Sequence, residues 1–284
     1  NGGLILLNGG TLTLNGVITA NGLGTGQGGT IQLVGNSIVI QSLANFSARG
    51  GAGGGLGGVI DINSAGNVST ANGSVMATQG LSSNTANLIT IQGTGVNIDG
   101  LVNTKSITGG DAGKIVVSGN TVTITGHGRL LADSATGQGG TILITGDTTI
   151  DGDVIADTAA NNQTAGTITI TGSYVGGGNS TGPGILYDST TGVSTSGSIN
   201  LVSGLGVGAR ILLSNGSISG TAGVTVKAGA GVPIDLGSAT DSASRADLSD
   251  AELDLITTSG TLQIGASDSG TITISDAITR SAST

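Results

Sequence analysis

The chain of 284 residues has no cysteine and no tryptophan, and it has only two prolines, two tyrosines and one phenylalanine. Without cysteine there is neither a disulfide framework nor thiol chemistry. A conventional hydrophobic core in a chain of this length normally includes more large aromatic side chains. The composition therefore favours a fold that buries thin layers of valine, isoleucine and leucine rather than one thick core.

Charged residues are scarce and unbalanced, with eight lysines and arginines against seventeen acidic residues and a formal net charge of −9. Such a surface repels the phosphates of nucleic acids and anionic lipids. No apolar run approaches the ~20 residues of a membrane-spanning helix, and no signal-peptide pattern opens the sequence. We therefore expect no nucleic-acid partner and no membrane span, and we interpret the chain as a processed product or a segment of a longer protein.

Glycine is abundant, with 56 residues, and short apolar pairs of the form I-x-[I/L/V] recur along the chain. The glycines follow no Gly-X-Y period, which excludes collagen. The pairs recur at spacings of 26 to 31 residues, and a period of this size built on short β-type runs predicts stacked coils. The first isoleucines of the pairs are Ile5, Ile31, Ile60, Ile89, Ile115, Ile142, Ile168 and Ile199.

Two further apolar sites follow each of the first seven anchors, and corners of glycine, asparagine, serine or aspartate separate them. The predicted second sites are Leu12, Ile38, Val68, Val96, Val122, Ile150 and Val175. The predicted third sites are Val17-Ile18, Leu43, Val75-Met76, Leu101-Val102, Leu130-Leu131, Val154-Ile155 and Ile185-Leu186. We therefore predict an all-β fold, a right-handed parallel β-helix with three strands per coil and about 26–31 residues per repeat.

The repeat breaks after Leu236, and a short helix is predicted within residues 241–257. Ser249 and Glu252 have the spacing of a capping box, and Leu248 and Leu253 occupy the hydrophobic-staple positions around it. We predict a solenoid in residues 1–236, a helical insertion or cap in 237–258 and further solenoid strands in 259–284.

The repeated G-T-I-x-[I/L/V]-x-G units, the segment A-E-L-D-L-I-T-T-S-G-T-L-Q-I-G and the segment G-T-I-T-I-S-D-A-I-T resemble bacterial filamentous-haemagglutinin-like large exoproteins. The resemblance implies a β-helical shaft of the two-partner-secretion type, exported by a partner transporter and acting in adhesion or surface structure. The N-P-N-G-type motif of the family's secretion domain is absent from this sequence. The resemblance therefore implies a part of the shaft.

We expect a non-catalytic structural or adhesive module located outside the cell or on the bacterial surface. A host-cell, glycan or matrix ligand is compatible with this function, and the sequence identifies none. An alternative is a filament subunit that stacks end to end, with the edge at residues 1–18 against the edge near 260–278, because open β edges pair readily. In a longer chain, the same edges would continue into further coils.

A third alternative, which we expect to be wrong, is a carbohydrate-active enzyme. Gly126-His127-Gly128 is similar to an element of polygalacturonases, but the other elements of that family, including an adjacent aspartate pair, are absent. Without paired carboxylates, glycoside hydrolysis lacks its acid and base. We interpret His127 as a solvated turn residue and expect no cofactor.

Asp147, Asp151, Asp153 and Asp157 form the densest acidic group of the solenoid. Clustered carboxylates suit calcium, but neither the EF-hand spacing nor tandem nonapeptides occur. Solvated corners of one coil explain these residues, and we expect no metal site.

One outward position of each coil lies directly after its anchor residue. On an ice-binding surface, threonine would repeat at this position in successive coils. In this sequence the residues at the position are mixed. They are Leu6, Gln32, Asp61, Thr90, Val116, Leu143, Thr169 and Asn200. Val116 and Leu143 are apolar in neighbouring coils, which indicates either cover by a glycine-rich loop or a lateral contact with another chain or segment.

Overall fold

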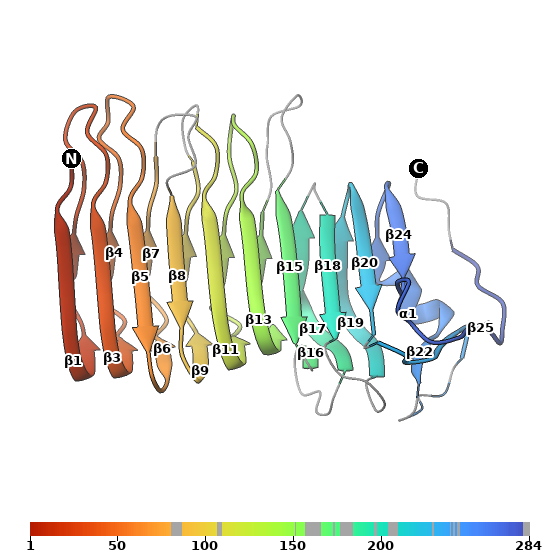
Figure 1. Cartoon of the computed structure of the whole chain (residues 1–284). Coiled ribbons are helices and arrows are strands. Elements are labelled where there is room, and N and C mark those ends of the chain that lie inside the picture. Colours follow the sequence, from red (N-terminus) through yellow and green to blue (C-terminus); the bar gives the residue numbers. More distant parts are fainter. Residues whose placement is uncertain are drawn as a thin grey trace.

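The computed structural model describes residues 1–80, 87–106, 110–150, 152–156, 166–172, 174–176, 184–195, 198–203, 210–228, 230–238, 240, 242 and 245–280. Parallel strands stack side by side along an elongated solenoid, from β1 at one end to β24 near the other (Figure 1). The predicted all-β parallel solenoid is confirmed.

The first face of the solenoid is one continuous parallel ladder. Each predicted anchor lies opposite the next one, from Ile5 opposite Ile31 to Ile168 opposite Ile199, and the anchors from Ile31 to Ile199 are fully buried. The ladder continues through Val224 to Leu262. It is formed by β1 (Leu4–Leu14), β3 (Thr30–Ile40), β5 (Val59–Ser64), β8 (Leu88–Gln92), β11 (Lys114–Ile124), β13 (Thr141–Ile150), β15 (Thr167–Gly172), β18 (Ser198–Ser203), β20 (Gly223–Lys227) and β24 (Thr261–Ile264).

The second face is built by the second halves of β1, β3, β11 and β13, because in these coils one long strand runs through the first corner. Its other members are β6 (Val68–Thr70), β9 (Gly95–Ile98), β16 (Tyr174–Gly176) and the first halves of β17 (Gly184–Thr195) and β19 (Arg210–Gly220).

The prediction of Ile150 as a second-site residue is wrong. Thr148 lies opposite Val122, and Ile150 lies opposite Ile124. A register shift between Ser118 and Thr121 lengthens β11 relative to β13 and displaces the apolar pattern. Thr148 is fully buried, and its hydroxyl donates a 2.7 Å hydrogen bond to the carbonyl of Gly146, which satisfies the buried donor.

The third face is formed by short strands and by the ends of two long ones. It contains β2 (Val17–Thr19), β4 (Asn45–Ser47), β7 (Val75–Ala77), β10 (Leu101–Asn103), β12 (Arg129–Leu131), β14 (Asp153–Ile155), the second halves of β17 and β19, and β23 (Ile256–Thr257).

Two predicted third-site assignments are wrong. Phe46, not Leu43, lies between Ile18 and Met76, and Phe46 is fully buried whereas Leu43 is 72% exposed. Val193, not Ile185, lies opposite Val154, because Ile185 pairs with Val175 on the second face.

Glycine-rich returns connect the third face of one coil to the first face of the next, and they emerge along one edge of the solenoid (Figure 1, top). Successive returns contact each other through their backbones, as in the 2.8 Å hydrogen bond from the Gly51 amide to the Gly26 carbonyl. A Cβ atom on Gly55 would lie 2.0 Å from the Gly26 carbonyl oxygen. Close approach between neighbouring returns therefore requires glycine at this position.

A small parallel sheet and one short helix accompany the last strands of the ladders, and most of their residues come before β24 in the chain. In the sheet, β21 (Ile234–Leu236) lies between β22 (Ala246–Leu248) and β25 (Ile272–Ile274). The helix α1 (Asp250–Asp254) is shorter than the predicted range, because residues on both sides of it pair as strands in β22 and β23. The predicted capping box of Ser249 and Glu252 is present.

Candidate binding surfaces

The two apolar residues predicted to face outward are neighbours on the first face. Val116 in β11 lies opposite Leu143 in β13, and both side chains are half-buried. Thr90 precedes them and Thr169 follows them in the same outward row. The outward direction is therefore confirmed, and the lateral contact stays a prediction.

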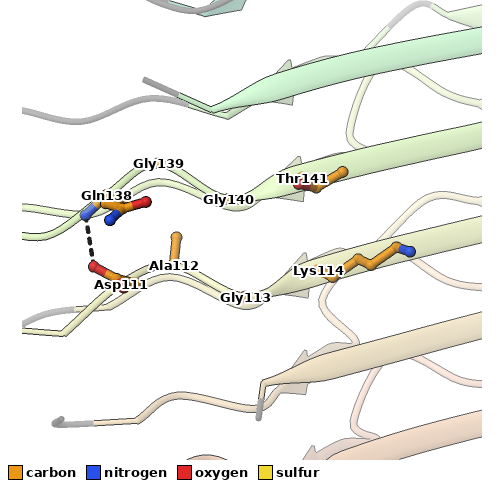
Figure 2. A pocket seen from close by; sticks show the side chains of 8 residues that line it. All are labelled: Asp111, Ala112, Gly113, Lys114, Gln138, Gly139, Gly140 and Thr141. Atoms are coloured by element: carbon orange, nitrogen blue, oxygen red, sulfur yellow. Dashed lines mark hydrogen bonds between the residues drawn. The ribbon is translucent and has the colours of Figure 1, made fainter. Parts of the chain in front are cut away.

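A groove of about 280 Å³ opens beside this pair, between the segments that lead into β11 and β13 (Figure 2). The Asp111 carboxylate accepts a 2.9 Å hydrogen bond from the backbone N–H of Gln138 across the groove. Lys114 and Thr141 lie opposite each other at its other end, two residues before Val116 and Leu143. The sequence patterns missed this groove because three of the eight lining residues are glycines, whose backbone rather than side chains shapes the walls.

A second groove, of about 410 Å³, lies on the outward side of the second face. Its floor includes Gly95 of β9, and its walls come from the neighbouring coils. The polar residues that line it carry hydroxyl or amide groups and are Ser37, Asn67, Ser69, Asn97, Thr121 and Thr123. In the sequence, two of these residues, Thr121 and Thr123, form a T-x-T pair.

His127 lies in an exposed corner, as predicted. Its Nδ1 atom lies 3.3 Å from Oδ1 of Asp99 in the preceding coil, and its side chain is 67% exposed. The Thr125 hydroxyl donates a hydrogen bond to the same carboxylate oxygen, and this bond is the main cause that lowers the pKa of Asp99. The backbone N–H of Asn72 donates a 3.2 Å hydrogen bond to the other carboxylate oxygen of Asp99, Oδ2. These contacts join three successive coils through one carboxylate.

Of the four residues in the acidic group of the sequence, the structure describes Asp147 and Asp153. The Asp153 carboxylate accepts a 2.9 Å hydrogen bond from Nε of Arg129 in the preceding coil. Asp147 belongs to the outward row of the second face, whereas Asp151 and Asp157 lie outside the described residues. In the part of the chain that the structure describes, no group of three or more histidine, cysteine or acidic side chains is placed to hold a metal ion.

Both ends of the first ladder have a strand with one unpaired edge among the described residues. β1 pairs only with β3 on this face, and β24 pairs only with β20. Ile5 and Leu7 of β1 are half-buried, whereas their partners Ile31 and Leu33 are fully buried. Leu262 of β24 is likewise half-buried. Each edge thus exposes apolar surface that another strand would cover.

Comparisons of the chain with protein-family models, with curated proteins and with solved structures found no match. In the part of the chain that the structure describes, no helix is long and apolar enough to cross a membrane. The fold class, a parallel β-solenoid, and the surfaces described above are therefore the basis for the functional proposal.

Proposed function

We propose that this chain is a non-catalytic structural and adhesive module of a bacterial exoprotein, located outside the cell or on its surface. The observation that supports this proposal is the unbroken first-face ladder from β1 to β24, which makes the chain a stiff spacer with polar outward rows. Stacked coils satisfy each other's backbone groups, so that stiffness does not depend on disulfides or on a thick core.

Two measurements test this proposal. Small-angle X-ray scattering of the purified chain is expected to give the pair-distance distribution of a rod. Antibodies against the chain are expected to label intact cells of the source organism as strongly as permeabilised cells. A compact particle in scattering, or labelling that requires permeabilisation, contradicts the proposal.

A second candidate function is end-to-end stacking into filaments, and the two unpaired ladder edges favour it. The first face would continue across the junction with Leu4–Leu7 of one chain beside Thr261–Ile264 of the next. In that register, Ile5 and Leu7 lie opposite Leu262 and Ile264 and bury their apolar surface. No charged residue occurs in residues 1–48, so no side-chain charge at this end opposes the contact.

Negative-stain electron microscopy over a concentration series tests this second candidate. Fibres of constant width are expected for the wild type, and Ile5→Asp is expected to abolish them because it places a charge in the junction. Leu23→Asp is the matched control, since Leu23 is 86% exposed and lies in a return. Single rods at every concentration contradict the filament and leave the spacer function standing.

A further inference from the structure

We propose that the second face of the solenoid binds a neutral carbohydrate chain in the groove around Gly95. This ligand class rests on the adhesive part of the proposed function and gives it a site. The groove, of about 410 Å³, crosses successive coils, since its lining residues belong to β3, β6, β9 and β11 and to the corner before β6, which contributes Asn67. An extended ligand that lies across the strands would meet a new set of side chains every ~4.8 Å.

Gly95 leaves the hollow open, and the atoms nearest to the place of a Cβ belong to side chains that line the groove. Gly95 does not have a positive φ, so its backbone conformation is open to other residues. A Cβ atom on it would lie 3.0 Å from Asn67 Oδ1 and 3.3 Å from Thr121 Oγ1, both at the ends of side chains. Gly55, in contrast, is held against a backbone carbonyl. A side chain at position 95 would therefore crowd Asn67 and Thr121 and fill the groove, so glycine at this position keeps the groove open.

The chemistry of the lining selects the ligand class. Its polar side chains are hydroxyls and amides, which both donate and accept hydrogen bonds, and no lining residue is charged. None of the Asn67, Asn97 or Thr121 side chains has a hydrogen-bond partner among the described residues. A ligand rich in neutral hydroxyl groups matches this lining, whereas an anionic ligand would find no counter-charge in it. Without an aromatic ring for stacking, affinity must come from many weak contacts along a chain.

Affinity electrophoresis in gels that contain dextran, laminarin or hydroxyethyl cellulose tests the proposal. The wild type is expected to be retarded by at least one of these neutral polysaccharides, equally at low and high salt. Gly95→Val fills the hollow with a residue that suits a strand, and we expect it to raise the dissociation constant at least about tenfold. Asn97→Ala removes hydrogen bonds to the ligand and should raise it roughly threefold to tenfold.

Thr90→Ala is the matched control, because Thr90 faces outward from the same coil on the first face. Its retardation should equal that of the wild type. The proposal is overturned if none of the three polysaccharides retards the wild type, or if Gly95→Val is retarded as strongly as the wild type. Small-angle X-ray scattering on the same samples distinguishes failure of the carbohydrate site from failure of the proposed function. A rod that the gels do not retard contradicts the carbohydrate site alone, whereas a compact particle contradicts the proposed function.

Discussion

Val116 and Leu143 lie directly opposite each other in the parallel ladder between β11 and β13, and they form an apolar pair on an outward face. Their neighbours in the same row are the threonines Thr90 and Thr169. The groove between Asp111 and Thr141 lies beside it (Figure 2).

We expect the double variant Val116→Asp with Leu143→Asp to keep the fold and to lose self-association. Two carboxylates in place of two apolar groups would repel a partner surface and each other. Analytical ultracentrifugation over a concentration series measures the association, and circular dichroism verifies the fold. Thr123→Asp with Thr149→Asp is the matched control, because these residues are opposite each other in the same two strands but on the second face. Unchanged association of the first variant rejects the lateral contact.

Phe46→Ala is expected to lower the free energy of unfolding by about 3–5 kcal/mol, because it leaves a cavity beneath the third face. Phe46 is fully buried between Ile18 and Met76. Urea unfolding measures the effect, and Leu43→Ala is the control, expected to change the free energy by less than about 0.5 kcal/mol. Equal losses in both variants would mean that Phe46 is not the residue that fills this layer.

Ser249→Ala is expected to lower the free energy of unfolding of the C-terminal part by about 1 kcal/mol, because it removes the cap of α1. The Ser249 hydroxyl accepts a 3.3 Å hydrogen bond from the Glu252 amide, and the Glu252 carboxylate accepts a 2.8 Å bond from the Ser249 amide. Urea unfolding with hydrogen exchange localises the loss. Ser275→Ala, an exposed serine nearby in the sequence, should change little; an equal loss there would argue against the cap.

Acidification should destabilise the chain partly through Asp99. The pKa of Asp99 is lowered, chiefly by the hydrogen bond from Thr125, so its carboxylate stabilises the fold above the ordinary pKa of 3.8. This contribution is lost as the pH falls from 3.8 through the lowered pKa. We therefore expect Asp99→Asn to lose less stability than the wild type between pH 7 and the acid range, as measured by thermal unfolding.

Thr125→Val is a second test of the same effect, since it removes the hydrogen bond that is the main cause of the lowered pKa of Asp99. The acid loss should shrink in this variant as well. If both variants lose as much stability on acidification as the wild type, Asp99 does not contribute to it.

The anchor isoleucines could be predicted because their period follows directly from stacking. The assignment of Leu43 failed because apolar character alone does not fix which residue of a corner turns inward. The assignment of Ile150, which is also buried, failed because a register shift places Thr148 opposite Val122. Phe46 stands alone between polar residues, and Thr148 is a polar residue in an apolar row. Only the pairing with neighbouring coils decides these positions.

The candidate surfaces were harder to predict than the ladder. The outward direction of Val116 and Leu143 follows from strand alternation, so the sequence was sufficient there. The groove around Gly95 depends on a missing side chain between Asn67 and Thr121, which come together from different coils. Such a hollow is a property of three strands at once, and a pattern within one repeat does not contain it.

The described glycine-rich returns leave the ladders along one edge (Figure 1). Their lengths vary while the strands stay in register, so that edge can absorb insertions without disturbing the stack. Consecutive return segments are rooted ~4.8 Å apart. Short peptides inserted at chosen returns would therefore be displayed in a single line along the solenoid, at separations fixed by the spacing of the coils.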